Sequence, residues 1–552
     1  QINKLNVTTA GSFEIGNTNT LAFVSDINIK GNGPMLVGSL VDLKNLGSIS
    51  SENGVSLKVN DLATATLGDA NVIALKVGDI ITKVDNNAGA NVNLKNITNG
   101  IEVNKIDVSG EVTFAANNIG GLKIVDSITS KKSSITFDVS GVRHDVNLGG
   151  ATQTIEAKND VNISIKNVEG KLDITKIKAQ NVTINATNVE NKYDTVGTSK
   201  TINVSEIDEN VKSLKVTLKD ILRSTGTGFE IGKIALKENS SVVIDAGNTR
   251  GLVKIGGTTN VKADSVSIDL HDTIGANVIT GIEADTVVYK GSVQTPLSSD
   301  VKLFAKQDVN SKDFTATVTT SAQDDVLDVT VATKVATVGK DLKTVTVSGN
   351  MGEGLLDKYK FDGTNAGELT KIDFSGLTNV EKGTITTVAA NTKIESIKGT
   401  AGDDEITLAD DQTAENVVIE TGEGENKVTT GTVLNSGKHT ITINGGSGND
   451  TFDVSASTIT GGFDGSNPNN IQMTVINNLN VGDKIKIAAA ATAGRIEDSG
   501  KVYLNANGVA QNNFAKAAVE GGFFTGTGHN VASTVYAYSY MGDTYLVYNS
   551  AA

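Results

Sequence analysis

The feature that most constrains this chain is the nonapeptide Gly445–Asp453, which reads Gly-Gly-Ser-Gly-Asn-Asp-Thr-Phe-Asp. It fits the pattern G-G-x-G-x-D-x-U-x, in which U is a large apolar residue, at every specified position. Glycine adopts backbone conformations that side chains forbid, so this segment can turn tightly with carbonyl oxygens pointing to one side. Phe452 then begins a short strand with its side chain toward a core. The pattern predicts a glycine turn that leads into a strand.

Two imperfect copies precede this segment. Gly399–Thr407 departs from the pattern only at its second residue, and Thr421–Thr429 departs at its first residue and at Asn426, where an amide replaces the carboxylate. The acidic position of the pattern recurs after 22 and then 24 residues, at Asp404, Asn426 and Asp450. Two nonapeptides per coil would repeat every ~18 residues. Larger coils are therefore predicted, with the glycine turns stacked on one edge.

The residues between the turns predict two strands per coil. Alternating apolar and polar residues, typical of a strand with one buried face, occur in Glu405–Leu408, Val417–Thr421, Lys427–Thr430 and His439–Asn444. Each coil would then have one glycine-rich edge and one plain edge.

Stacked glycine turns of this pattern are calcium-binding turns. Calcium is a hard cation that takes roughly six to eight oxygen ligands, and the turns offer carboxylates and carbonyl groups. We expect Asp404, Asp450 and the carbonyl groups of their turns to be the main ligands. The alternative is that the turns are merely polar turns of an all-β domain. The full set of candidate metal-binding residues is Gly399, Ala401, Asp403, Asp404, Gly422, Glu423, Glu425, Asn426, Gly445, Ser447, Asn449 and Asp450.

The composition favours a long β-solenoid. The chain has 552 residues, 4% aromatic residues, no Trp and three Pro, and a chain of this length forms several domains or a repeat array. Short alternating segments follow one another through residues 61–290, separated by turns of Gly, Asn and Asp. This spacing also fits tandem β-sandwiches. The same pattern of short strands and polar turns continues for more than two hundred residues, however, which favours a parallel β-helix. The predicted class is all-β, with β-solenoid domains, a calcium β-roll and a small aromatic C-terminal cap.

Five regions are predicted along the chain. They are an N-terminal β cap or first coils at 1–60, a β-solenoid at 61–290, a second β region at 291–395, the calcium roll at 396–480 and a C-terminal cap at 481–552.

Helices are expected at few positions. Ala488–Ala493 and Asn513–Glu520 are the strongest candidates, and Met351–Lys360 is a further short one. The first half of Val211–Ser224 alternates as a strand does. Tyrosines on both sides of Gly542-Asp543 predict an aromatic hairpin that caps the roll.

Charge and motifs exclude several function classes. The net charge of −15 disfavours nucleic-acid binding, because phosphate recognition needs a basic face. No apolar run approaches the ~20 residues of a membrane span, and no zinc-protease, serine-hydrolase or nucleotide-binding motif occurs. Neighbouring aspartates such as Asp403-Asp404 and Asp410-Asp411 are compatible with the paired carboxylates of a β-helix glycosidase. Calcium binding explains these aspartates more simply, because they lie beside the glycine turns. His144 and His271 are expected to be exposed turn residues.

The glycine turns resemble those of the RTX group, bacterial proteins that leave the cell by type I secretion and fold on extracellular calcium. Segments such as Leu369–Thr378 and Gly542–Tyr548 are similar to the C-terminal halves of RTX-type surface-layer (S-layer) proteins of Gram-negative bacteria such as Caulobacter and Campylobacter. Those proteins also lack cysteine, which is absent from this chain.

The resemblance implies a secreted structural protein, not an enzyme, that self-assembles with copies of itself into a calcium-dependent two-dimensional lattice on the cell surface. It also implies lipopolysaccharide as a partner, through a part outside this chain. Two alternatives stay open: a secreted RTX adhesin, and a β-helix enzyme that degrades polysaccharide.

Overall fold

The structure is a computed structural model. The residues that it describes are 4–9, 14–15, 26–31, 44–46, 49–51, 54–62, 73–82, 87–150, 153–193, 200–222, 226–275, 277–291, 300–305, 313–320, 326–330, 342–352, 358–363, 367–389, 391–431, 439–456, 472–487, 492–497, 534–540 and 543–549. Within these stretches the secondary structure consists of β-strands and no helix occurs. The predicted all-β class is confirmed.

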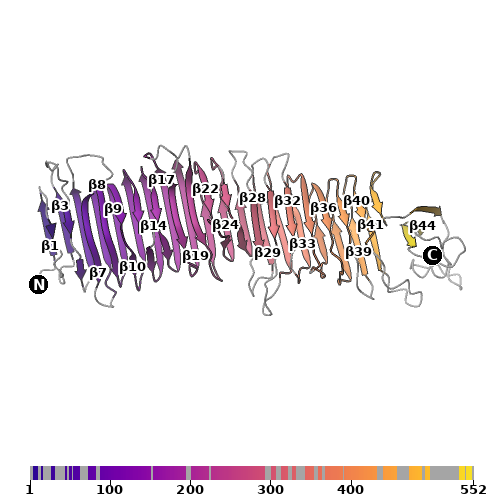
Figure 1. The fold of residues 1–552 in the computed structure, drawn as a ribbon, viewed down its shortest axis with the longest axis horizontal. Coiled ribbons are helices and arrows are strands. Elements are labelled where there is room, and N and C mark those ends of the chain that lie inside the picture. The colour runs from indigo at the N-terminus through magenta and orange to yellow at the C-terminus, as the bar shows by residue number, and fades with distance from the viewer. Residues whose placement is uncertain are drawn as a thin grey trace. The chain divides into compact units, whose positions relative to one another are not determined.

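The chain divides into two compact units, Gln1–Lys306 with Val318–Asp325 and Gln307–Thr317 with Val326–Ala552. Strand β29 (Asp313–Thr319) lies across the division. Within the first unit, indigo to magenta in Figure 1, and within the orange part of the second, strands distant in sequence run side by side. Among the described residues, the strand pairings inside these two stacks are parallel, whereas a β-sandwich pairs its strands antiparallel. The predicted solenoid is confirmed and the tandem sandwich is wrong.

The coils of the first unit form three walls of parallel strands. Wall one contains β1 (Lys4–Thr9), β3 (Asp26–Gly31), β6 (Val55–Leu62), β8 (Ala90–Val108), β9 (Val112–Ile124), β11 (Ile135–Val142), β14 (Asp160–Val168), β17 (Asn181–Glu190), β19 (Ser213–Leu222), β21 (Ser241–Asp245), β24 (Ser265–Asp269) and β27 (Thr286–Lys290). Wall two contains β2 (Glu14–Ile15), β4 (Lys44–Leu46), β7 (Ile73–Thr82), β12 (Val146–Leu148), β15 (Leu172–Ile174), β18 (Lys200–Ile207), β20 (Thr227–Ile234), β22 (Leu252–Ile255) and β25 (Asn277–Ile279), with the later parts of β8 and β9. Wall three contains β5 (Ile49–Ser51), β10 (Ile128–Ser130), β13 (Thr154–Ala157), β16 (Lys176–Lys178), β23 (Val261–Lys262), β26 (Ile282–Ala284) and β28 (Asp300–Ala305), with the ends of β7, β8, β18 and β20.

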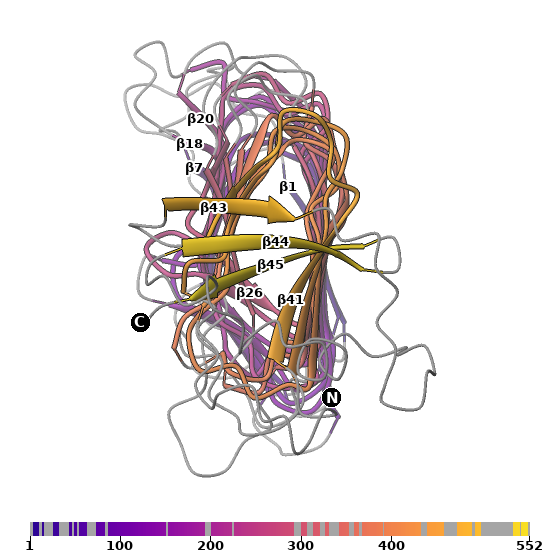
Figure 2. The same cartoon turned by 90° about the vertical axis from the view of Figure 1, so that its right-hand side faces the viewer.

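Long strands such as β8 bend from one wall into the next. Figure 2 looks along the stack, and β7, β18 and β20 lie one behind another in it. The core of the first unit is therefore the space that the three walls enclose.

Inward-facing side chains form stacks that run from coil to coil. In wall one, Phe114, Phe137, Ile163 and Ile184 lie in register on consecutive strands, and all four are buried. The rings of Phe114 and Phe137 have centroids 5.4 Å apart. Full burial of each such side chain stabilises the fold by about 1.5–3 kcal/mol. The alternation read from the sequence thus places the aliphatic residues inside, as predicted.

A column of residues with left-handed backbone, named the corner ladder here, turns the chain from wall one to wall two. Its members are Asn96, Asn118, Gly141, Asn167, Asn188, Asp220, Asn248 and Asp272. The Asn118 amide donates to Asn96 Oδ1 at 2.9 Å, and the Asn188 amide donates to Asn167 Oδ1 at 2.8 Å. Glycine, asparagine and aspartate tolerate positive φ best. The sequence alternation predicted the strands but not this repeat.

The stack of the second unit has two walls. Wall four contains β31 (Thr344–Asn350), β33 (Lys371–Thr378), β35 (Ser396–Lys398), β37 (Asn416–Glu420), β39 (His439–Asn444) and β41 (Gln472–Asn477). Wall five contains β30 (Val326–Thr330), β32 (Lys358–Asp362), β34 (Lys382–Thr386), β36 (Asp403–Thr407), β38 (Lys427–Thr429), β40 (Thr451–Asp453) and β42 (Lys484–Lys486). The prediction of two strands per coil around the glycine turns is confirmed.

A separate small sheet lies near the C-terminus. Strand β43 (Thr492–Glu497) pairs parallel with β44 (Thr534–Tyr540), which pairs antiparallel with β45 (Asp543–Asn549). The predicted tyrosine hairpin is confirmed as this β44–β45 pair.

Two predicted helices are corrected. The helix over Ala488–Ala493 is wrong at its last two residues, which begin β43, and its other residues lie outside the described part. The helix over Met351–Lys360 is wrong at its end, where β32 pairs with two neighbours. Local helix propensity is a weak preference that tertiary pairing overrides. Asn513–Glu520 lies outside the described residues.

Candidate calcium turns and their aspartate ladder

The three glycine turns lie one above another on one edge of the second unit. They join β35 to β36, β37 to β38 and β39 to β40, and the strands that follow them pair in register. The stacking predicted from the spacing of the motifs is confirmed.

The acidic position of each turn points into the coil and hydrogen-bonds to the neighbouring coil. The backbone N–H of Asp404 donates to Asn426 Oδ1 at 3.0 Å, and that of Asn426 donates to Asp450 Oδ1 at 2.9 Å. The N–H of Asp450 donates in turn to Asp483 Oδ1 at 2.8 Å. We name Asp404, Asn426, Asp450 and Asp483 the aspartate ladder. Its first three members are at most 2% exposed, and Asp483 is half-buried.

Each aspartate of the ladder also closes its own turn. The second carboxylate oxygen of Asp404 accepts the N–H of Thr400 at 2.5 Å, and that of Asp450 accepts the N–H of Gly446 at 3.2 Å. In the next coil, Asp483 Oδ2 accepts the N–H of Asn480 at 2.6 Å. One side chain therefore satisfies donors of two coils.

The amide of Asn426 uses its extra donor group on the turn itself. Its Nδ2 donates to the carbonyl oxygens of Glu423 and Gly424 at 3.1 and 3.2 Å, and to Asp450 Oδ1 at 3.1 Å. The middle turn thus engages two carbonyl groups that an aspartate would leave available.

The N-terminal end of the ladder is closed by a buried tyrosine. Tyr359 stacks on Phe374 with ring centroids 4.7 Å apart, and its hydroxyl donates to Asp404 Oδ1 at 2.9 Å. The ring passes the backbone of Gly383, where a Cβ would lie 1.8 Å from it. Burial raises the pKa of Asp404 from its usual 3.8 to about 6, although hydrogen bonds from Thr400 and Tyr359 act to lower it. Burial and the neighbouring Asp404 also raise the pKa of Tyr359.

The second glycine of the motif is required by the close approach of stacked turns. A Cβ on Gly422 would lie 1.7 Å from the carbonyl oxygen of Thr400, and one on Gly446 would lie 1.4 Å from that of Gly422. These glycines are therefore explained by coil packing, with or without a bound ion.

The structure sorts the candidate ligands into an inward and an outward set. The buried residues are Gly399, Asp404, Asn426, Gly445 and Asp450. The exposed residues are Ala401, Asp403, Gly422, Glu423, Glu425, Ser447 and Asn449. Asp403 and Asp404 point to opposite sides of β36, so they do not form the carboxylate pair of a glycosidase.

The ligand chemistry of the turns fits calcium, because carboxylate and carbonyl oxygens are what this ion selects. Within the stretches that the structure describes, no three Asp, Glu, His or Cys side chains converge on one point. A calcium ion at this edge would therefore be held by an inward carboxylate together with carbonyl oxygens, and not by a cluster of acids.

Sequence reasoning missed Asp483 as a member of the ladder. It follows Asp450 by 33 residues, because a longer connection separates β40 from β42. The signal that could have found it is Gly482-Asp483 followed by the alternating Lys484–Lys486, a shortened form of the turn and strand.

The histidines are placed differently from one another. His144 is buried and its ring lies 4.8 Å from that of Tyr193, so its expected exposure is wrong. His271 is half-buried, and its Nδ1 lies 2.6 Å from Asp269 Oδ1. Burial raises the pKa of Asp269, but hydrogen bonds from His271 outweigh it, so the pKa lies below its usual value.

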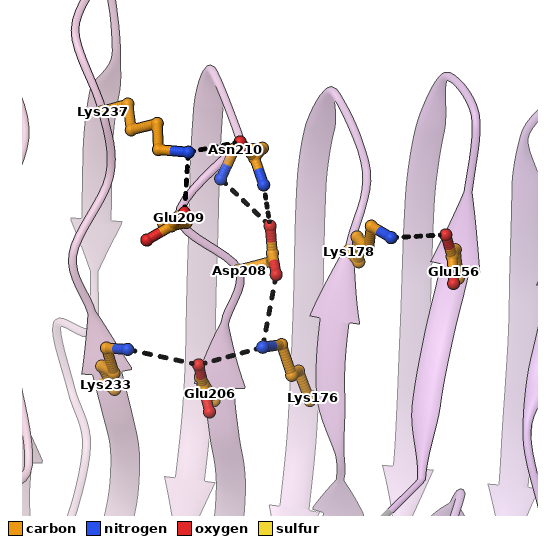
Figure 3. Close-up of polar contacts among 9 residues, drawn as sticks. All are labelled: Glu156, Lys176, Lys178, Glu206, Asp208, Glu209, Asn210, Lys233 and Lys237. Atoms are coloured by element: carbon orange, nitrogen blue, oxygen red, sulfur yellow. Dashed lines mark hydrogen bonds and ion pairs between the residues drawn. The ribbon is translucent and has the colours of Figure 1, made fainter.

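Ion pairs join adjacent coils on the outer surface of the first unit. Figure 3 shows Glu206 between Lys176 and Lys233, at 3.2 and 3.6 Å. In the same cluster, Lys176 also contacts Asp208 at 3.2 Å and Lys178 contacts Glu156 at 2.7 Å. Pairs this exposed contribute about 0–1 kcal/mol each.

Comparison of the chain with protein-family models, curated proteins and solved structures finds no match. The part of the chain that the structure describes contains no helix long and apolar enough to cross a membrane.

Proposed function

We propose that this chain is a structural surface-layer protein that assembles into a calcium-dependent two-dimensional lattice on the bacterial cell surface. The observation that carries the proposal is the aspartate ladder, whose carboxylates Asp404, Asp450 and Asp483 pair with no lysine, arginine or histidine among the residues that the structure describes.

The ladder places negative charge where water is excluded. Asp404 and Asp450 are buried, and the partners described above are neutral N–H and O–H groups. The ion pairs described in the second unit use other acids. An isolated buried carboxylate is strongly unfavourable unless it is protonated or paired with a cation. This supports a bound cation, and the surrounding carbonyl oxygens favour calcium.

The architecture supports a structural role for such a calcium-loaded chain. Parallel coils bury their apolar side chains in continuous stacks, and every coil is fixed by its neighbours. A ligand that binds only the folded state stabilises it, so calcium outside the cell would make the roll rigid. We infer assembly into a lattice from the resemblance of the glycine turns to those of RTX surface-layer proteins.

Electron microscopy of the purified chain tests the lattice directly. We expect ordered sheets in calcium and soluble particles after chelation by EGTA. Sheets that persist unchanged in EGTA would sink the proposal. A chain that binds calcium but stays monomeric at every concentration would support the secreted adhesin instead.

Calorimetric titration with calcium tests the ladder itself. We expect Asp450→Asn to weaken binding by about tenfold or more, because one charge-assisted ligand is worth at least ~1.4 kcal/mol. Asp328→Asn, a half-buried position on β30 of the same unit, is the charge-matched control and should bind as the original chain does. Equal affinity in both variants would exclude Asp450 as a ligand.

A further inference from the structure

The outward face of wall one carries lysines without acidic partners. Lys95, Lys166, Lys215 and Lys219 are exposed on β8, β14 and β19. Within the described part of the chain, none of the four forms an ion pair or a side-chain hydrogen bond. We name these four residues the lysine face.

The strands between these lysines present small neutral side chains. The outward positions of β9, β11, β14 and β17 include Thr113, Thr136, Ser164, Asn162, Thr183 and Asn185. Asp138 and Asp220 lie on or beside the same face. The ammonium groups are therefore accessible on a flat sheet without bulky neighbours.

Lysines of wall two pair with acids on neighbouring strands. Lys76 pairs with Glu102 at 3.0 Å, and Lys200 pairs with Glu230 at 2.7 Å. The chain as a whole carries a net charge of −15, so acids are plentiful elsewhere on it. Lysines left unpaired on the outer surface of an acidic protein are available to a complementary acidic surface outside the coil.

A complementary surface exists in the second unit. Glu381, Asp403, Glu423 and Glu425 are exposed around the glycine turns, with Lys382 beside them. No lysine or arginine pairs with these four acids among the residues that the structure describes. We name Glu381, Asp403, Glu423 and Glu425 the acid edge. Asp403, Glu423 and Glu425 belong to the outward set and Glu381 is exposed beside them, so the acid edge stays available when calcium occupies the inward ladder.

We propose that the lysine face of one copy docks against the acid edge of a second copy of this chain. The inference rests on the proposed lattice and names one of its contacts. Because the contact joins two different surface patches, it is heterologous. Contacts of that kind form rings when the rotation between copies closes and open assemblies when it does not, and a lattice uses the open kind.

The periods of the two surfaces match, which favours a second copy over an anionic polysaccharide. Neighbouring strands lie about 4.8 Å apart. Lys166 and Lys219 are two strands apart through Thr187, or about 10 Å. Glu381 and Glu425 are also two coils apart, because Asp403 lies between them. Two solenoids share this spacing by construction, so their charges can meet in register.

The test replaces the lysine face and follows assembly in calcium. The variant carries Lys95→Gln, Lys166→Gln, Lys215→Gln and Lys219→Gln. The control carries Lys76→Gln, Lys123→Gln, Lys200→Gln and Lys254→Gln, which remove the same charge from wall two. Sedimentation velocity and electron microscopy then give the protein concentration at half assembly, and thermal melting checks that each chain folds.

We expect the lysine-face variant to need about tenfold or more protein to assemble, since rim charges control association, and the control to stay within about twofold. Raising sodium chloride from roughly 50 to 500 mM should weaken assembly of the original chain, because salt screens exposed charges. A second variant with Glu381→Lys, Glu423→Lys and Glu425→Lys should restore assembly when mixed with a Lys→Glu version of the lysine face.

The outcomes separate this inference from the proposed function. If the original chain assembles and the lysine-face variant assembles equally well, the docking contact is wrong and the lattice stands. If the variant instead loses binding to an anionic polysaccharide while assembly persists, the lysine face serves that ligand and the inference is overturned. If the original chain forms no assembly in calcium, both are rejected.

Discussion

At the scale of single residues, Asp404 connects proton binding to the stability of the roll. Its pKa in the folded chain is raised by burial to about 6, above the 3.8 of the unfolded chain. The folded state therefore binds the proton more tightly. Its contribution is fully present below pH ~4 and is lost as the pH rises through about 6, by up to about 3 kcal/mol. Other carboxyls with lowered pKa values, such as Asp453, act in the opposite direction at lower pH.

Asp404→Asn tests this assignment, because an amide imitates the protonated acid as Asn426 does in the next coil. In EGTA at pH 7.5 we expect the variant to be more stable than the original chain by about 1–3 kcal/mol. At pH 4 the difference should vanish. Urea unfolding across pH 4–8 measures it, and a difference that does not change with pH would contradict the buried carboxylate.

Asn426 is the neutral member of the ladder and separates the carboxylates of Asp404 and Asp450. Asn426→Asp would add a carboxylate between Asp404 and Asp450 and remove the amide that donates to Glu423 and Gly424. We expect a loss of about 2–4 kcal/mol in EGTA, and a smaller loss in calcium. Asn416→Asp, exposed at the start of β37, is the control. Equal stability of the two variants would show that the ladder tolerates the charge.

At the scale of elements, the corner ladder decides where each coil of the first unit bends. Asn118→Ala leaves a side chain that cannot form hydrogen bonds at a φ of 53° and removes the hydrogen bond to Asn96. We expect a loss of about 1–3 kcal/mol in urea unfolding.

Asn118→Gly should cost less than the alanine variant, since Gly141 already serves at the same corner. Asn162→Ala, outward in the middle of β14, should have little effect. If alanine at 118 is as mild as alanine at 162, the corner is set by packing alone.

The strands were predictable because each wall alternates buried and exposed residues, and alternation is a local signal. The corner ladder was not predicted, because its members recur at uneven intervals, such as 21 residues for Asn167–Asn188 and 32 for Asn188–Asp220. The glycine turns were predictable because their motif specifies several residues within one short segment. Asp483 and the Tyr359 contact depend on coils joined through longer connections, which spacing alone does not reveal. The short helices failed because pairing across coils overrides local propensity.

At the scale of the whole molecule, the stability of the second unit should depend on calcium, whereas that of the first unit should not. The first unit is held by apolar stacks and the corner ladder, whereas the second contains the aspartate ladder. We expect EGTA at pH 7.5 to speed hydrogen exchange of peptides from 399–456 by tenfold or more and to leave those from 135–190 unchanged, because ligand removal destabilises only the unit that binds it.

Hydrogen-exchange mass spectrometry with and without calcium measures this difference, and Asp450→Asn provides a chain that should respond less to EGTA. Equal change in both segments would contradict calcium binding confined to the roll.

The aspartate ladder also has a direction. Asp404 donates its N–H to Asn426, Asn426 to Asp450, and Asp450 to Asp483, so the acceptor for each coil is supplied by the coil that follows it in sequence. During synthesis from the N-terminus, the acceptor for each of these N–H groups is therefore made after the donor. The ladder can be completed only once the coil that contains Asp483 has been made.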